Sequence, residues 1–288
     1  MKLEDISAEI RPRNEWESVD LGFALTRRCY GACLRSWMIT VLPVWALVLG
    51  LMHQNLVWAM LLLWWWKPIF ERVPLFVLSR SLFGEVPSPW QVLRAWPKMM
   101  GRRLWYTLVP GRLSPSRPMI GPVVELEGLK GNELRQRKDS VTTRSTGSCL
   151  WMQILLLMVL HSVWLAVIAT VYFLIPAQIR PPLEDLWAKR EDLGDAGVEA
   201  MKWAWVILYF AALTLVSPFL IGGGFGLYLN ARTRIEGWDI ELAFRQLGNR
   251  LRSLGQGGKQ VALILVTGFL VWGGLRPKEV ASQRDPGR

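Results

Sequence analysis

The chain has 288 residues, of which 51% are hydrophobic and 17 are tryptophans, and its formal net charge is +11 at pH 7. The apolar residues are concentrated in long blocks, which excludes an ordinary soluble domain and indicates a membrane protein. The positive charge does not indicate nucleic-acid binding, because the basic residues lie beside the apolar blocks and form no zinc-finger, RNP or helix-turn-helix signature. Anionic phospholipid is the expected counter-charge.

Four stretches contain no charged residue, and we expect them to hold the membrane-embedded part, since a spanning helix needs about 20 predominantly apolar residues. They cover residues 36–66, 145–179, 203–231 and 260–275. The predicted fold is therefore an all-α integral membrane protein with about five hydrophobic segments. Two apolar hairpins are each followed by a basic amphipathic cytoplasmic helix, and a short last segment completes the set.

Residues 1–34 are expected to form a cytoplasmic amphipathic arm on the inner leaflet, and residues 35–66 a helical hairpin that turns at His53-Gln54-Asn55. The distribution of charge favours this hairpin over a single pass. With the hairpin, 26 of the 34 Lys and Arg residues lie on one side of the membrane, whereas a single pass leaves only 20 there. By the positive-inside rule, this side is cytoplasmic and includes the N-terminus.

Residues 67–148 are expected to form a basic cytoplasmic loop with amphipathic helices, directly after an aromatic belt at Trp64-Trp65-Trp66. Within this loop, residues 69–83 are either an interfacial helix with snorkelling arginines or a continuation of the second span. We expect the interfacial helix, because an arginine at the bilayer centre costs about 2.5–3.5 kcal/mol. A short basic helix follows, with Ser88 as its N-cap and Pro89 at its first position.

Residues 149–229 are expected to form a second membrane hairpin. Its external loop, 176–202, has four basic and six acidic residues and therefore the opposite sign from the loop before it. His161 lies near the middle of the third span, and an ionisable side chain at that depth is a candidate intramembrane polar site. The alternative is a neutral imidazole that shares a hydrogen bond with a backbone carbonyl or with a polar group on another helix. We expect this alternative, because no carboxylate lies inside any span to pair with the histidine.

The glycine-rich stretch at 222–226 ends the fourth span and is expected to turn the chain into a cytoplasmic amphipathic helix at 230–259. The Gly222-x-x-x-Gly226 spacing allows either the close approach of another helix or a hinge, and the sequence does not separate the two. Residues 260–275 are expected to form a short membrane segment about 24 Å long, with a re-entrant or interfacial segment as the alternative. Residues 276–288 are expected to be a disordered tail.

The chain has no P-loop, no hydrolase or metalloprotease motif, no dinucleotide fingerprint and no cluster of His and carboxylates, so no catalytic residue, cofactor or metal is predicted. The candidate surface for a partner or a lipid head group comprises Lys67, Arg72, Arg80, Asn230, Arg232, Arg234, Glu236, Trp238 and Asp239. Arg232 and Glu236 form an i, i+4 pair of opposite charge, which is typical of a solvated helix face. In a second interpretation the arginines bind phosphate, and Glu236 or Asp239 acts as a base.

Three motifs carry a resemblance to a known family. They are RPRNEWESVDLGFAL at 11–25, WWWKPIFER at 64–72 with LSRSLFGE at 78–85, and YLNARTRIEGWDIEL at 228–242. Together they resemble a family of uncharacterised multi-pass inner-membrane proteins of gammaproteobacteria over nearly the full length of the chain. The resemblance implies a bacterial inner membrane and, as partners, a MoxR-type ATPase system or other membrane proteins. It implies no activity and no catalytic residue.

Two functional hypotheses follow. The first is a non-enzymatic scaffold or subunit of a membrane-associated complex, which docks cytoplasmic partners on the helices at 67–106 and 228–254. The alternative is an enzyme or carrier for a lipid-linked or phospholipid substrate, with His161 or the polar residues between Asn230 and Glu241 as its site.

Overall fold

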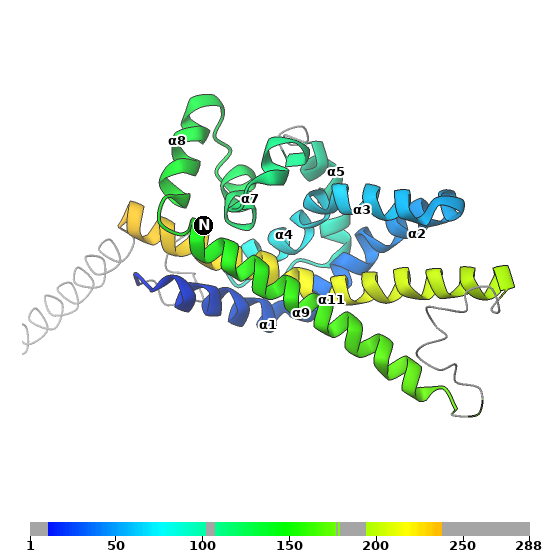
Figure 1. Cartoon of the computed structure of the whole chain (residues 1–288). Coiled ribbons are helices and arrows are strands. Elements are labelled where there is room, and N and C mark those ends of the chain that lie inside the picture. The colour runs from blue at the N-terminus through cyan, green and yellow to red at the C-terminus, as the bar shows by residue number, and fades with distance from the viewer. Residues whose placement is uncertain (1–10, 102–106, 177, 179–193, 238–288) are drawn as a thin grey trace, which may run out of the picture. The chain divides into compact units, whose positions relative to one another are not determined.

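A computed structural model describes residues 11–101, 107–176, 178 and 194–237. These residues form helices and turns and no strand, so the predicted all-helical class is confirmed for this part of the chain. In chain order (Figure 1) the helices are α1 (Glu15–Thr40), α2 (Leu42–Leu51), η2 (His53–Asn55), α3 (Leu56–Phe70), α4 (Arg72–Ser81), α5 (Pro89–Gly101), η3 (Pro110–Leu113), α7 (Arg117–Leu126), α8 (Gly131–Thr142), α9 (Thr146–Leu174) and α11 (Gly194–Glu236). The two labelled η are short 3₁₀ helices.

Three helical stretches of the described chain are long and apolar enough to cross a membrane. They are Glu15–Leu51, Thr146–Leu174 and Gly197–Glu236. The arrangement of five segments is not confirmed, because α3 has only 15 residues and residues 260–275 lie outside the described part. The chain does form a 3₁₀ turn at His53–Asn55, where the sequence predicts one. That both arms beside this turn cross the membrane stays a prediction.

The expected N-terminal arm is continuous with the first membrane-compatible helix. α1 begins at Glu15 and passes through residue 34 without interruption. Ser18, Val19 and Gly22 of its first turns are buried, and Gly22 lies directly against α11. From Glu15 onward, the residues expected to form a separate arm are therefore the first half of a long helix that packs on another helix. Their position relative to the membrane stays a prediction.

Glycines bring the backbones of α1 and α11 together. A Cβ atom on Gly22 would overlap the carbonyl oxygen of Gly222, and one on Gly226 would overlap the carbonyl oxygen of Ser18. The expectation that these glycines turn the chain is wrong, because α11 runs through them and continues to Glu236. Glycine costs about 1 kcal/mol in a helix, but here it permits close helix packing. Of the two alternatives for the Gly222-x-x-x-Gly226 spacing, the structure therefore has the close approach of another helix and not the hinge.

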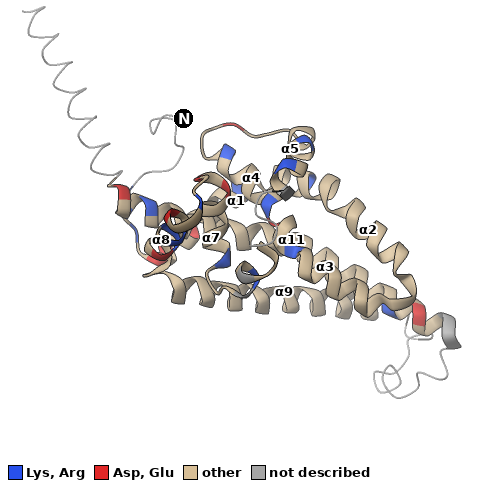
Figure 2. Cartoon of the chain, turned by 90° about the horizontal axis from the view of Figure 1, so that it is seen from above, with Lys and Arg blue, Asp and Glu red and all other residues tan. Residues whose placement is uncertain are grey.

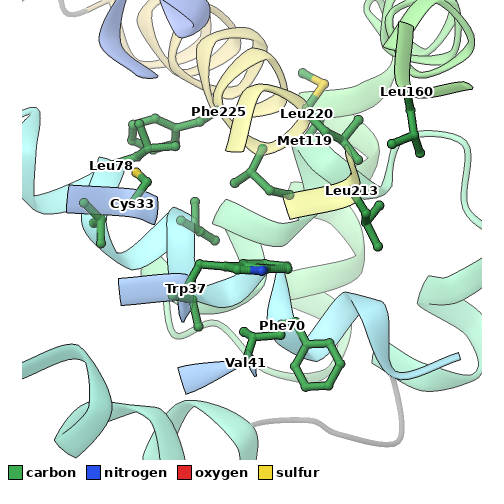
Figure 3. Close-up of a cluster of buried hydrophobic side chains, with 14 of the residues drawn as sticks. Cys33, Trp37, Val41, Phe70, Leu78, Met119, Leu160, Leu213, Leu220 and Phe225 are labelled. Carbon is green, nitrogen blue, oxygen red and sulfur yellow. The ribbon is translucent and has the colours of Figure 1, made fainter. Parts of the chain in front are cut away.

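A buried cluster of large apolar side chains joins α1, α3, α4, α7 and α11 (Figure 3). Trp37 is 1% exposed. The ring of Trp45 lies 5.8 Å from that of Trp37 and 4.2 Å from that of Phe210 on α11. The ring of Trp45 also lies 6.2 Å from that of Phe70 on α3, so the α1–α2 connection is held against both α3 and α11.

Helix α4 belongs to this core, so Arg72 does not snorkel to water as expected for residues 69–83. That this stretch lies at the membrane interface stays a prediction. Arg72 is only 5% exposed, and Val73, Val77 and Leu78 are also buried. The expectation assumed that an arginine must snorkel to water. Instead Arg72 has a carboxylate partner, Glu125 of α7, within the protein. The helix predicted to follow is confirmed as α5, where Ser88 and Gln91 bond each other's backbone N–H as a capping box.

The charged residues are unevenly distributed over the helices. They lie on α1, α4, α5, α7, α8 and both ends of α11, whereas α2 and α9 carry none and α3 carries only Lys67 near its end (Figure 2). α9 has the highest mean hydropathy of the three membrane-compatible helices, 2.5, and only 6% of its most apolar window is buried. Apart from His161 on α9 and Lys67 near the end of α3, the described polar candidate residues therefore lie on α4 and at the end of α11.

Candidate functional site

Three of the candidate residues, Arg232, Glu236 and Lys67, belong to two clusters of polar side chains. The first, here termed the α11-end network, comprises Glu127, Arg137, Tyr228, Arg232 and Glu236. The second, the Lys67 cluster, comprises Lys67, Glu71, Arg112 and Arg117.

In the α11-end network, two arginines link two carboxylates from different segments. Arg137 of α8 donates to Glu127 through Nε at 2.7 Å and Nη2 at 3.1 Å, and it also pairs with Glu236. Arg232 donates to Glu236 through Nε at 3.0 Å and Nη2 at 2.8 Å. The i, i+4 pair expected from the sequence is thus confirmed, and α8 adds a second arginine to it. The pKa of Arg137 is raised, chiefly by the hydrogen bond to Glu127.

Tyr228 closes the network on the side of the bundle. Its hydroxyl donates to Glu127 Oε1 at 3.0 Å and accepts from Arg232 Nη1 at 3.2 Å. The candidate surface expected from the sequence did not include Glu127, Arg137 or Tyr228, although Tyr228 begins the third motif. Glu127 and Tyr228 are 101 positions apart, and no local spacing relates them. The two arginines balance the two carboxylates, so the network is neutral as a whole.

Asn230 and Arg234 bind the backbone of the N-terminal segment. The Asn230 side chain accepts from the Arg13 N–H at 2.9 Å and donates to the Arg13 carbonyl at 3.0 Å. Arg234 donates to the same carbonyl. Close by in sequence, Glu15 accepts from Ser145 at 3.3 Å, just before α9. Four of the expected residues therefore join segments of this chain, whereas Trp238 and Asp239 lie outside the described residues.

The Lys67 cluster places three cations around one carboxylate. Glu71 Oε1 lies 3.0 Å from Arg117 Nη2 and 3.6 Å from Lys67 Nζ. The side chains are largely buried, with 6% of Glu71, 14% of Arg117 and 18% of Lys67 exposed. Arg112 donates to the carbonyl of Trp64 at 3.0 Å, and its guanidinium carbon lies 3.9 Å from the centre of a Trp64 ring.

The positive charge of this cluster is only partly compensated. Burial lowers the pKa of Lys67, and Arg117 and Arg112 lower it further, against the opposing effect of Glu71. Burial likewise lowers the pKa of Arg112, with the charge of Arg117 as the next cause. Both shifts have the direction expected where the cationic form is destabilised by its surroundings.

Arg72 and Arg80, which the sequence grouped with Lys67, have other surroundings. Arg72 pairs with Glu125 at 3.2 Å and donates to the Thr107 hydroxyl at 2.6 Å and to the Met99 carbonyl. A cavity of about 60 Å³ lies beside it, lined by Glu71, Arg117 and Glu125 among others, which is room for about two waters. The Arg80 guanidinium lies 4.6 Å from the ring of Phe76. Arg72 therefore serves mainly to hold α4 to α7.

His161 has the surroundings that the sequence favoured. Its Nδ1 lies 2.8 Å from the Leu157 carbonyl of its own helix. Because the carbonyl can only accept, Nδ1 carries the proton. The nearest rings are those of Trp164 at 6.3 Å and Tyr209 at 6.5 Å. Within the described residues, no group of three or more His, Cys, Asp or Glu side chains is arranged to hold a metal ion.

Comparisons of the chain with family models, with curated proteins and with solved structures find no match. The resemblance to inner-membrane proteins of gammaproteobacteria, together with the location and partners it implies, stays a prediction.

Proposed function

We propose that this chain is a membrane-embedded scaffold or subunit of a membrane-associated complex, and that its polar end is a platform on which a partner protein docks. This proposal is supported by four side chains near the end of α11 that bond to other parts of the same chain or to each other. They are Asn230, Arg232, Arg234 and Glu236. They join the segment around Arg13, the α7–α8 region and the end of α11. A surface whose parts are bonded in this way is preorganised, which lowers the entropic cost of docking.

The same bonds favour a scaffold over the alternative, an enzyme or carrier that acts on a lipid-linked or phospholipid substrate with Glu236 as its base. A general base must direct an unshared electron pair at the substrate. Both oxygens of Glu236 instead accept from Arg232, and Oε1 also pairs with Arg137. A carboxylate stabilised by two guanidinium groups is a poor proton acceptor.

The positive-inside rule supports a cytoplasmic platform in a bacterial inner membrane, with the N-terminus on the same side. The outer face of α8 would then meet the partner, since Glu133, Arg135 and Asp139 are all exposed there. Mixed exposed charges suit a polar partner and set specificity and association rate more than affinity. By the resemblance of the sequence motifs, the partner is a MoxR-type ATPase system or another membrane protein.

Site-specific photo-cross-linking in native membranes tests this function. A cross-linker in place of Arg135 is expected to trap one discrete protein, whereas one in place of exposed Val57 on α3 is expected to give no such adduct. Arg232→Glu breaks the α11-end network and is expected to abolish the adduct. Arg144→Glu makes the same change of charge at an exposed position and is expected to leave it intact. Equal adducts in both variants, or no adduct at position 135, would contradict the proposal.

A further inference from the structure

One face of α3 is an apolar stripe that no other described helix covers. Its members, here termed the α3 stripe, are all between 40% and 70% exposed: Val57, Trp58, Leu61, Trp64 and Trp65. Their spacing of one, three and four positions places them on a single helix face about 12 Å long. The opposite face of α3, with Ala59 and Leu63, is buried in the core. The α3 stripe is therefore suited to contact with the hydrocarbon chains of lipids.

The Lys67 cluster lies at the end of this stripe. Arg112 stacks on Trp64, whose ring centre is 3.9 Å from the guanidinium carbon. Lys67 follows Trp64 by three positions, which places both on nearly the same helix face. Tryptophans at this position in a membrane helix are typical of the level of the lipid head groups. An apolar helix face and a set of cations thus meet at Trp64.

The cluster has unused hydrogen-bond donors. The Nε atoms of Arg112 and Arg117 are buried and have no acceptor among the described residues. Buried donors in native proteins are almost always paired. Three cations surround the single carboxylate of Glu71, and that carboxylate already accepts from Arg117. Because both Nε atoms are buried, an anion with several acceptor oxygens would meet the cluster where Lys67 and Arg117 are partly exposed.

We propose that the Lys67 cluster binds the phosphate of an anionic glycerophospholipid, one acyl chain of which lies along the α3 stripe. Phosphate oxygens match the planar donor pattern of arginine, and the negative charge offsets the excess positive charge left by Glu71. The stripe selects a lipid over a soluble anion, because only a lipid carries hydrocarbon next to its phosphate. This site shares no residue with the α11-end network, so lipid binding and partner docking are tested by different variants.

The test uses the full chain, delipidated in mild detergent, with bound lipid counted by native mass spectrometry during titration. Phosphatidylglycerol is expected to bind at least about tenfold more tightly than phosphatidylcholine, whose phosphate already carries a compensating cation. Arg112→Gln and Lys67→Gln are each expected to weaken phosphatidylglycerol binding about tenfold. Arg94→Gln, which removes an exposed arginine on α5, is the matched control and is expected to bind like the wild type.

Two further measurements separate the lipid from its alternatives. Leu61→Asn interrupts the stripe and is expected to weaken phosphatidylglycerol binding without altering the cations. Inorganic phosphate at millimolar concentration is expected not to displace the lipid. Displacement by inorganic phosphate would overturn the proposal in favour of a soluble anion. Equal binding of the two lipids, or wild-type affinity in Arg112→Gln and Lys67→Gln, would also overturn it.

Discussion

Gly22 of α1 and Gly222 of α11 meet backbone to backbone, since a Cβ atom on Gly22 would overlap the Gly222 carbonyl. Gly22→Ala is therefore expected to lower the free energy of unfolding by about 1–3 kcal/mol through overpacking. Gly31→Ala on the same helix adds its methyl group to open space and is expected to stabilise by about 0.5–1 kcal/mol. Thermal unfolding in detergent measures both effects. Equal unfolding temperatures for the two variants would contradict the contact between Gly22 and Gly222.

Asn230 is expected to determine the order of the N-terminal segment. Asn230→Ala removes both hydrogen bonds to Arg13 and should speed amide hydrogen exchange at Arg13 and lower stability by about 1–3 kcal/mol. Asn230→Asp keeps an oxygen that can accept from the Arg13 N–H but loses the donor to its carbonyl. It is therefore expected to retain partial protection. Exchange rates unchanged in Asn230→Ala would show that other contacts hold this segment.

The coupling between α8 and α11 is expected to depend on Arg137. Arg137→Gln leaves Glu127 and Glu236 without their shared guanidinium, whereas Arg135→Gln removes an exposed charge two positions away. Only the first is expected to destabilise the protein. In a double-mutant cycle with Glu236→Gln, a coupling free energy of about 0.5–3 kcal/mol is expected. If the two substitutions change the free energy of unfolding additively, Arg137 and Glu236 are not coupled.

Lys67 is expected to reduce stability when no anion is bound. The pKa of Lys67 is lowered in the folded protein from the ordinary value of 10.5. At pH values between the lowered pKa and 10.5, the unfolded chain therefore binds more protons than the folded chain does. The free energy of unfolding should therefore rise with pH across this window. Lys67→Met should remove this part of the pH dependence and raise stability in lipid-free detergent. A less stable Lys67→Met under these conditions would show that its pair with Glu71 outweighs the cost of burial.

The features that the sequence predicted correctly depend on neighbouring residues. The helix that the structure describes as α9 was expected from its uncharged window. The N-cap at Ser88, the turn at His53–Asn55 and the pair of Arg232 with Glu236 follow from short spacings. Helical period, capping and charge are local properties, and they determine where helices form and which of them suit a membrane.

The sequence alone determined that this is a helical chain with long charge-free windows suited to a membrane, flanked by charged residues. The tertiary structure decided what Gly222, Arg72 and Glu236 do. A glycine without a Cβ permits a turn, a hinge or a helix contact, and only the presence of Gly22 on α1 selects the contact. Arg72 could be buried because Glu125 lies beside it. Glu236 became a connector because Arg137, 99 positions away, reaches it. Such pairings depend on how distant segments pack, which local spacing does not encode.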